Sequence, residues 1–254
     1  MNDNSIHLNN ISMHFDLGAR KIEALSGISF GIRRNSFVSI VGRSGCGKST
    51  LLRIISGLIE PTSGSASIDG LAPLDYRKNK QFGFVFQEPG LLPWKTASQN
   101  VSLPLEILKA GDRAACRRKA LDLLGLVRLD GFEHHYPKQL SGGMRQRVAI
   151  ARALSYQPDI ILMDEPFGAL DDFTRREMHD ELIRIWREQK VTVVFVTHSL
   201  NEALYLSDRI VVLSPNPGRV KQIIDVESPR TADRLSSASF HRQVSELEGL
   251  VHEH

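Results

Sequence analysis

The sequence predicts an α/β fold with a mixed β core, and three observations lead to this prediction. A glycine-rich loop at residues 42–50, GRSGCGKST, stands between a short apolar run at 37–41 and a helical pattern of leucine and isoleucine at 51–58. Two further apolar runs, 160–163 and 192–197, end in polar residues. Buried strands followed by polar residues are typical of α/β proteins, where ligands bind beyond the carboxyl ends of the strands.

The glycine-rich loop matches the phosphate-binding pattern G-x-x-x-x-G-K-[ST] through Gly42, Gly47, Lys48 and Ser49. Its backbone N–H groups and the positive end of the following helix would converge on one anion. Lys48 would reach the β and γ phosphates, and Ser49 would place its hydroxyl on Mg²⁺. An ordinary glycine-rich turn is the alternative, and the strand, loop and helix context argues against it. The predicted nucleotide-binding residues of the loop are Gly42, Arg43, Ser44, Gly45, Cys46, Gly47, Lys48, Ser49 and Thr50.

The composition is ordinary for a globular protein, with 254 residues of which 24% are charged and 41% hydrophobic. The excess of 32 Lys and Arg over 29 Asp and Glu gives a net charge of only +3, which offers no electrostatic argument for nucleic acid. The longest apolar runs fall far short of the roughly 20 residues that cross a bilayer. No membrane span is therefore expected.

The N-terminal segment and the two cysteines favour the cytoplasm. Residues 1–10 show no basic region followed by an apolar stretch, so no secretory signal is expected. Cys46 and Cys116 do not form a disulfide framework. Cys46 is interpreted as a small residue that fills a loop position, rather than as a redox group or a nucleophile.

An antiparallel β subdomain is expected next to the phosphate-binding loop. Residues 6–15 and 22–32 alternate apolar and polar side chains around a turn-like segment, and another short strand is predicted at 65–69, after a turn at 61–64. Phe15 is suited to stacking on a base, although packing within its strand is the simpler interpretation of this residue alone.

The middle of the chain combines a strand, an apolar loop and helices. A buried strand at 82–86 ends at Gln87, whose neutral amide suits contact with both a metal and an attacking water; capping of the strand is the alternative. The loop at 88–94 carries two prolines and large apolar side chains, which suggest a buried turn or a docking surface. Helices are predicted within 100–129 and, from the segment LSGGMRQR onward, within 140–154.

A second anion site is predicted where this last helix begins. Ser141, Gly142 and Gly143 offer a hydroxyl and bare N–H groups at the positive end of a helix dipole. The site has no lysine and no hydroxyl that could hold a metal, so it is not expected to bind a nucleotide by itself.

Three predicted strands end at polar residues that suit one γ phosphate. Asp164 is placed to hold Mg²⁺ through water, and Glu165 is available to orient or deprotonate the attacking water. Gln87 and His198 end the other two strands. Each residue alone could be a surface or capping residue, but the convergence of all of them outweighs those separate interpretations.

The phosphate-binding loop, Gln87, LSGGMRQR, ILMDEP, ALD and His198, present in this order, make the chain resemble the ATP-binding subunit of an ABC transporter. The combination of LSGG with the loop is far more specific than either motif alone. The resemblance covers nearly the whole chain. It implies a single ABC ATPase domain over 1–254, with a helical subdomain at about 90–157 and a short C-terminal extension at about 215–254.

The resemblance also implies how the motifs act. Ser141, Gly142 and Gly143 would cap the ATP held by the phosphate-binding loop of a second copy, so that two sites form between head-to-tail subunits. Glu165 would be the catalytic base and His198 the switch that holds the γ phosphate.

Further roles follow from the same resemblance. Phe15 would stack on adenine, Asp171 would couple the two sites across the dimer, and Gln87 would sense both the metal and the docking surface. Met144 stands where many members have glutamine. Phosphate capping is expected to persist, because the helix N-terminus and Ser141 remain.

Within the family, the segments QEPGLLPW and SPNPGRV resemble those of nitrate, sulfonate and taurine importers. This implies separate membrane permease subunits that dock on residues 88–94, an external solute-binding protein that acts indirectly, and a peripheral position on the cytoplasmic face of the membrane. The solute itself is not encoded in this chain, because the permease and the binding protein select it.

A soluble ABC-type ATPase that does mechanical work on nucleic acid or ribosomes is the alternative function. Such proteins usually carry two ATPase cassettes or a long coiled coil, whereas this chain has one cassette and no heptad run. The sequence therefore favours the transporter subunit, with ATP and Mg²⁺ as its ligands and no nucleic acid partner.

Overall fold

A computed structural model describes residues 4–16, 18, 21–79, 82–226 and 237–252. Contacts divide the chain into two compact units, the first made of residues 1–80 and 192–254 and the second of residues 81–191. The turn expected around residues 17–20 lies, apart from Gly18, outside the described residues.

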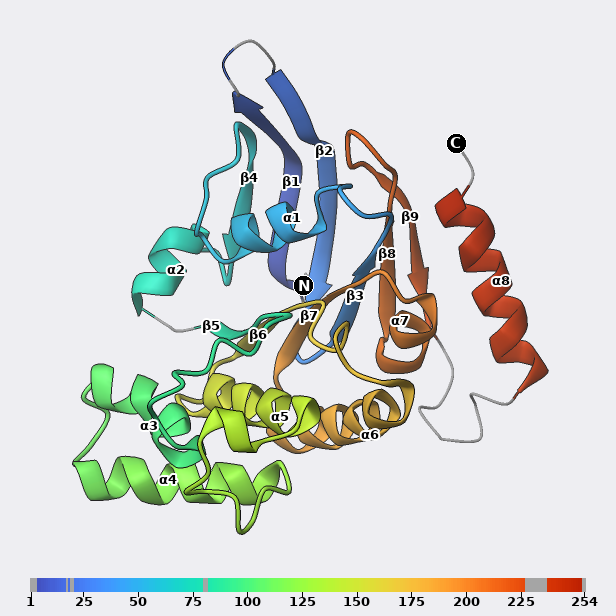
Figure 1. Cartoon of the computed structure of the whole chain (residues 1–254). Helices are drawn as coiled ribbons and strands as arrows, with labels where there is room; N and C mark the ends of the chain where they lie inside the picture. Colours follow the sequence, from blue (N-terminus) through green and yellow to red (C-terminus); the bar gives the residue numbers. More distant parts are fainter. Residues whose placement is uncertain (1–3, 17, 19–20, 80–81, 227–236, 253–254) are drawn as a thin grey trace. The chain divides into compact units, whose positions relative to one another are not determined.

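The first unit contains a mixed sheet with the strand order β7-β3-β8-β9 (Figure 1). Strand β3 (Phe37–Val41) pairs in parallel with β7 (Thr192–Thr197) and with β8 (Arg209–Leu213), and β9 (Val220–Asp225) pairs antiparallel with β8. All residues of β3 and β7 are buried, as the apolar runs in the sequence predicted.

A second sheet of the first unit is antiparallel, with the order β2-β1-β4. It consists of β1 (Asn4–Asp16), β2 (Lys21–Arg33) and β4 (Ser63–Ile68). The three strands confirm the predicted antiparallel region, although β4 begins two residues earlier than expected because Ser63 and Ser65 already pair with β1.

The described residues of the first unit also form helices α1 (Lys48–Ile55), α2 (Pro73–Asn79), α7 (Leu200–Leu206) and α8 (Ala238–His252). Helix α8 buries Phe240, Val244 and Leu247, whose spacing in the sequence is typical of one face of a helix. It packs on α7 and β8.

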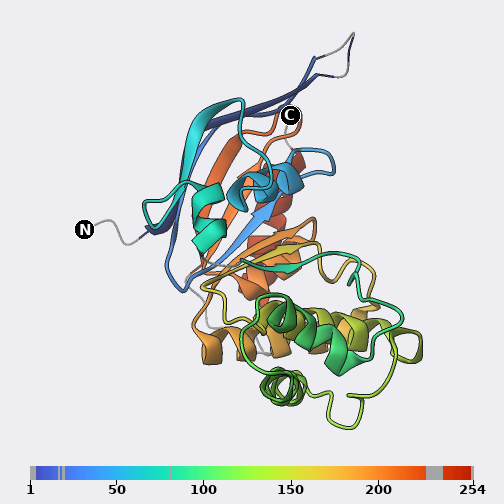
Figure 2. The ribbon, with the colours of Figure 1, turned by 90° about the vertical axis from the view of Figure 1, so that its left-hand side faces the viewer.

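In the second unit, residues 82–191 form a parallel strand pair and several helices. Strands β5 (Phe82–Val85) and β6 (Ile160–Asp164) pair in parallel. The helices are α3 (Ala97–Ile107), α4 (Arg113–Leu126), α5 (Gly142–Leu154) and α6 (Asp172–Gln189), with a short 3₁₀ turn at Pro137–Gln139. Helix α4 lies along α3 in Figure 1 and is seen end-on in Figure 2.

The helices predicted within 100–129 correspond to α3 and α4, which residues 108–112 separate. The Asp112 carboxylate accepts a hydrogen bond from the Ala115 N–H at 2.6 Å and so caps the start of α4, while Thr96 and Gln99 form a capping box at the start of α3. No helix among the described residues is both long and apolar enough to cross a membrane.

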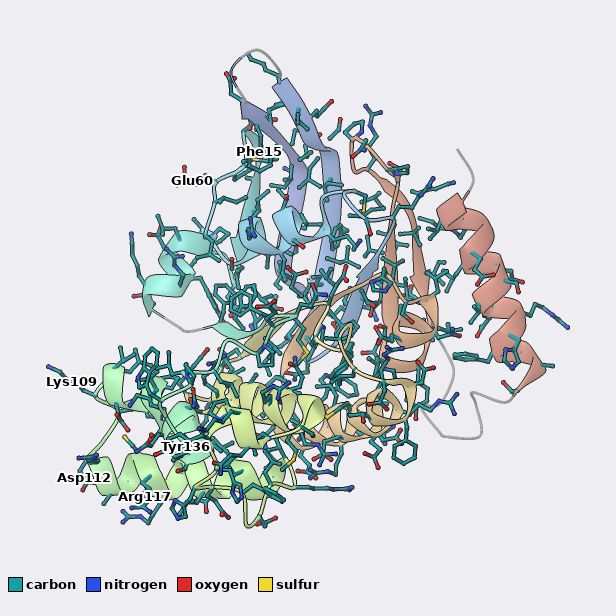
Figure 3. The ribbon with its side chains drawn as sticks, viewed as in Figure 1. Phe15, Glu60, Lys109, Asp112, Arg117 and Tyr136 are labelled. Carbon is teal, nitrogen blue, oxygen red and sulfur yellow. The ribbon has the colours of Figure 1, made fainter. Side chains whose placement is uncertain are left out.

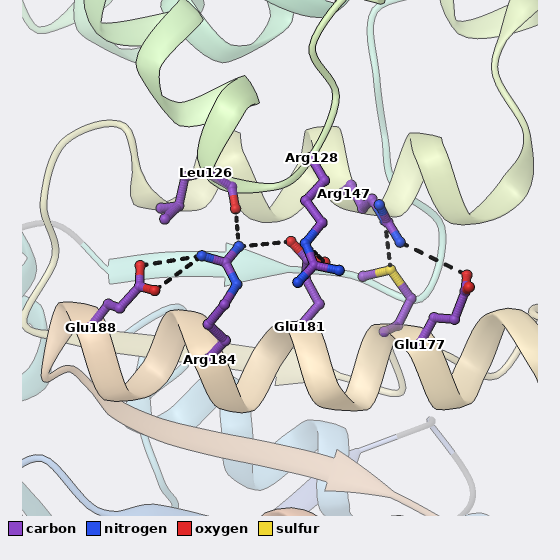
Figure 4. A network of polar contacts seen from close by, with 8 residues as sticks. Leu126, Arg128, Arg147, Glu177, Glu181, Arg184 and Glu188 are labelled. Atoms are coloured by element: carbon purple, nitrogen blue, oxygen red, sulfur yellow. Dashed lines mark hydrogen bonds and ion pairs between the residues drawn. The ribbon is translucent and has the colours of Figure 1, made fainter.

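A buried carboxylate ties α6 to the end of α4 (Figure 4). Glu181, whose side chain is 1% exposed, accepts a hydrogen bond from Arg184 at 2.9 Å and pairs with Arg128 at 3.5 Å. Arg184 also donates to the Leu126 carbonyl at the last residue of α4 and pairs with Glu188. The Arg184 guanidinium therefore bridges two helices that are far apart in the sequence.

We expect Arg184→Met to lower the free energy of unfolding by about 2 kcal/mol, because it removes charged hydrogen bonds and leaves Glu181 with one exposed partner. Both tryptophans, Trp94 and Trp186, lie in the second unit, so their fluorescence during urea unfolding measures this change directly. Arg187→Met, at an exposed position of the same helix, is the control and should stay within about 0.5 kcal/mol of the wild type. Equal effects of the two changes would contradict the bridging role.

Candidate functional site

The phosphate-binding loop joins the buried strand β3 to helix α1, as the sequence predicted. Gly47 is the N-cap residue of α1 with φ of +93°, and no side chain caps the helix. The first N–H groups of a helix have no partner within the helix, and they lie at its positive end. This helix start has the geometry that binds phosphate.

Two glycines of the loop are required by their neighbours. A Cβ at Gly42 would lie 2.7 Å from Cys46 Sγ and 2.8 Å from the Leu213 carbonyl oxygen. A Cβ at Gly47 would lie 2.6 Å from Leu25 Cδ2 and 2.8 Å from the Ala24 carbonyl oxygen. The back of the loop is therefore packed tightly against β2 and β8.

The Lys48 ammonium is held within the loop itself. Its Nζ donates to the Gly42 carbonyl at 2.8 Å and to the Arg43 carbonyl at 3.2 Å, and the residue is 5% exposed. Ser49 and Thr50 follow in the first turn of α1 and are half-buried. A fixed positive charge thus lies beside the N–H groups at the start of the helix.

Cys46 is buried and 1% exposed, which fits its interpretation as a small residue that fills the loop. Burial raises the pKa of the Cys46 thiol, and the nearby Lys48 charge only partly opposes this effect. A raised pKa keeps the group protonated and poorly nucleophilic.

His198 lies at the same sheet edge as the phosphate-binding loop. Val41, the last residue of β3, is aligned with Thr197, the last residue of β7, and the two strands are parallel. The loop and His198 are therefore the next residues of neighbouring strands. The Thr197 hydroxyl donates to Glu202 and accepts from the Ser199 N–H at 3.0 Å, which fixes the turn that carries the exposed His198.

In the second unit the strand ends bring Gln87 and the two carboxylates together. Val85 of β5 is aligned with Met163 of β6, so Gln87 and Asp164 follow at the same edge of the pair. A Cβ at Gly168 would lie 3.4 Å from Gln87 Nε2 and 3.5 Å from the Glu165 carbonyl oxygen. The Gln87 amide therefore lies beside the turn that follows Glu165.

Glu165 has a backbone φ of +46°, in the left-handed region that a non-glycine residue rarely adopts. Such a conformation costs on the order of 1 kcal/mol and persists where the surroundings impose it, often at functional sites. It turns the chain sharply after β6, so Asp164 and the half-buried Glu165 do not continue the alternation of the strand.

The oxygen donors of Ser49, Gln87 and Asp164 fit Mg²⁺, which prefers hard oxygen ligands and is usually held by one or two carboxylates together with substrate phosphates. Within the described ranges, no group of three or more His, Cys, Asp and Glu side chains is arranged to hold a metal ion. The donor type of each of these residues, taken separately, suits a metal that arrives with the nucleotide.

The second predicted anion site lies at the start of α5. Ser141 is the N-cap residue, and its Oγ accepts a hydrogen bond from the Met144 N–H at 3.2 Å. This bond uses the backbone of Met144, so methionine is compatible with the cap. A Cβ at Gly143 would lie 2.5 Å from Thr174 Cγ2, which explains why this position is small.

Asp171 caps helix α6 by accepting the Thr174 N–H at 3.0 Å. Hydrogen bonds from the Thr174 backbone and side chain lower the pKa of this exposed carboxyl. Phe15 lies near the end of β1, opposite Ile22, and is 36% exposed (Figure 3). Its ring is therefore accessible, as stacking on a base requires.

Gly218 is a residue of the loop's surroundings that the sequence analysis missed. It belongs to the turn between β8 and β9, and its N–H donates to the Ala24 carbonyl while its carbonyl accepts the Ser26 N–H at 2.9 Å. A Cβ at Gly218 would collide with the Cys46 carbonyl oxygen of the phosphate-binding loop. The turn therefore supports the loop from behind, across a contact that sequence spacing does not reveal.

The chain belongs to the ABC transporter family, because residues 25–168, more than half of its length, match that family. It is accordingly an ABC ATPase that binds ATP. This membership agrees with the loop, strand ends and helix start described above.

Three relatives match nearly the whole chain. An uncharacterized ABC transporter ATP-binding protein of Methanocaldococcus jannaschii is 45% identical over 91% of this chain and 85% of its own length. An aliphatic sulfonates import ATP-binding protein of Bacillus cereus is 42% identical over 92% of this chain and 91% of its own. A taurine import ATP-binding protein of Rhizobium johnstonii is 45% identical over 92% of this chain and 90% of its own.

Solved structures confirm the predicted fold class. A dimeric ATP-binding cassette in a post-hydrolysis state, bound to ADP and Pi, has a TM-score of 0.78 at 38% identity and covers 88% of this chain and 100% of its own. A dimeric bacterial ABC transporter cassette has a TM-score of 0.77 at 40% identity with the same coverage.

We expect Gly218→Ala to weaken ATP binding at least tenfold in calorimetry, because the added methyl group forces the Cys46 carbonyl, and with it the phosphate-binding loop, to move. Gly249→Ala is the matched control: a Cβ at Gly249 meets nothing within 4 Å, and alanine favours the helix α8 in which it lies. An unchanged affinity of a folded Gly218→Ala protein would contradict the supporting role of the turn.

Proposed function

We propose that this chain powers the import of a small solute of the sulfonate or taurine type through a separate membrane permease. The observation that carries this proposal is the identity of 41–45% with proteins named as sulfonate or taurine import ATP-binding proteins, over about nine-tenths of the chain. The proposed position is peripheral, on the cytoplasmic face of the membrane. A solute-binding protein outside would act indirectly, and no nucleic acid takes part.

In the proposed ATP site, different residues bind the phosphates, the base and the metal and activate the attacking water. Lys48 and the N–H groups of the loop neutralise charge on the phosphates, and Phe15 stacks on adenine. Ser49, Gln87 and Asp164 would hold Mg²⁺, which would supply positive charge to the phosphates of ATP. Glu165 accepts the proton of the attacking water, and His198 holds the γ phosphate.

Two copies are proposed to close head to tail around two ATP molecules. The start of α5 has a capped hydroxyl and a positive helix end but no lysine, so it suits the outer side of a phosphate that another loop already holds. Ser141, Gly142 and Gly143 would supply these groups, and Asp171 would couple the two sites. The dimeric cassettes among the solved relatives support this arrangement.

The single ABC ATPase domain over 1–254, its helical subdomain at about 90–157 and the C-terminal extension at about 215–254 remain predictions. Within the helical part, exposed apolar side chains stand around the loop at 88–94: Phe86 is 48% exposed and Trp94 is 69% exposed. Large exposed apolar side chains are typical of interaction sites. This loop is proposed to receive the permease.

Glu165→Gln is expected to retain ATP binding and lose at least about 100-fold in single-turnover hydrolysis, because an amide does not accept the proton of water and a general base typically contributes roughly 10² or more. Glu60→Gln, at an exposed loop position (Figure 3), is the control and should hydrolyse like the wild type. Turnover of Glu165→Gln within a factor of about three of the wild type would remove Glu165 as the base.

The proposed function is tested by tagging the chain in its native cell, solubilising the membranes gently and identifying what co-purifies by mass spectrometry. We expect a permease with several membrane spans, whose solute can then be found by screening for stimulated ATP hydrolysis. Recovery only in the soluble fraction, with ribosomal or nucleic acid partners, would favour the mechanical ATPase instead.

A further inference from the structure

The segment that runs from β5 into the loop at 88–94 accepts hydrogen bonds through its backbone carbonyl groups. The donors are side chains of helix α5 and of Tyr156, two residues after the end of α5. Gln146, which is 2% exposed, donates from Nε2 to the Phe86 carbonyl at 3.3 Å. The Tyr156 hydroxyl donates to the Phe82 carbonyl. Burial raises the pKa of Tyr156 to about 12, so the phenol keeps its proton and remains a donor at neutral pH.

Arg152 holds the loop itself. Its Nη1 donates to the Gly90 carbonyl at 2.8 Å and its Nη2 to the Pro89 carbonyl at 2.6 Å. Gly90 has a φ of +55°, a conformation that glycine adopts without strain and that turns the chain sharply at these two carbonyls. A planar guanidinium makes two such bonds in a fixed geometry, which a lysine ammonium does not reproduce.

The backbones of α5 and β5 also lie in direct contact. A Cβ at Gly83 would lie 3.0 Å from the Ala153 carbonyl oxygen and 2.9 Å from Ile161 Cγ1. Packing this close leaves little room for β5 to slide on α5 without breaking contacts. The end of α5 and the strand that leads to Gln87 therefore form one rigid group.

Ser141 caps the start of the same helix. The two ends of α5 are therefore proposed to act on different partners. The N-terminus of α5 carries the proposed cap for ATP bound to a second copy. Near its C-terminus, Arg152 donates hydrogen bonds to the loop that is proposed to dock the permease. A helix is stiff over its thirteen residues, so a displacement at one end is carried to the other.

We propose that Arg152 is a positioning residue that makes the loop at 88–94 move together with α5, and so links ATP capture at Ser141 to the permease. This inference rests on the proposed function. It assigns to Arg152 no contact with ATP. Loss of Arg152 should therefore separate ATP binding from its effect on the permease, rather than abolish binding.

The test compares ATP hydrolysis by the isolated chain with hydrolysis by the complex that co-purifies from the membrane. Arg152→Met keeps the length of the side chain and removes all its donors. For each protein, the ratio of hydrolysis in the complex to hydrolysis by the isolated chain is measured. We expect this ratio to be at least tenfold lower for Arg152→Met than for the wild type. The ATP affinity of Arg152→Met in calorimetry should change less than about twofold. Arg152→Lys, which retains the charge but not the paired donors, should lower the ratio about threefold.

Arg117→Met is the matched control and should behave like the wild type, because the exposed Arg117 side chain of α4 makes no hydrogen bond or ion pair among the described residues (Figure 3). Hydrogen exchange adds a readout on the isolated chain: amides of residues 88–94 should exchange faster in Arg152→Met and Arg152→Lys, and not in Arg117→Met. If Arg152→Met does not assemble with the permease, this exchange measurement alone tests whether Arg152 holds the loop at 88–94.

The outcomes separate the inference from the proposed function. Failure of the wild-type chain to bring down any permease would overturn the proposed function. A wild-type complex that works, with Arg152→Met equally active in the complex and unchanged in loop exchange, would overturn the role of Arg152 alone. An equal loss of ATP affinity and of hydrolysis in Arg152→Met would show a general structural role and would overturn the inference too.

Discussion

The rest of the first unit depends on one constraint: a short helix must present bare backbone N–H groups to phosphate without a side-chain cap. Gly47 starts α1 in a left-handed conformation, and the loop is kept in shape from behind by β2, β8 and the turn that carries Gly218. Each of these contacts leaves no space for a Cβ. The chain thus fixes the loop by close packing of backbone, and its other side is the proposed site of the nucleotide phosphates.

In the second unit, helix α5 also has a positive N-terminal end. Helix α5 begins with a polar cap and glycines, but Ser141 has no lysine beside it, so the helix is proposed to contribute to a phosphate site without completing one. The strand ends of β5 and β6 supply the amide and carboxylates. The contacts of Gln146 and Arg152 then connect the helix to the strand and loop that carry Gln87.

Much of this could be predicted from the sequence because it is local. The phosphate-binding loop, the buried strands and the polar strand ends follow from runs of adjacent residues, and the terminal helix from the spacing of Phe240, Val244 and Leu247. Helices α2 and α7, of seven residues each, are too short to show a periodic pattern. Gly218 and Arg152 were missed because they act on residues far away in the chain, and Arg152 reaches across 62 positions to Gly90.

The most direct measurement of the central claim, that the phosphate-binding loop of one copy works with the start of α5 of another, is ATP hydrolysis by a mixture of two inactive variants. Lys48→Ala breaks the loop and Ser141→Glu breaks the cap, so either protein alone should be inactive. A head-to-tail pair of the two contains one site with an intact loop and an intact cap. We expect mixing to restore hydrolysis well above the sum of the separate proteins, and no recovery in a mixture shown to form pairs would contradict the account.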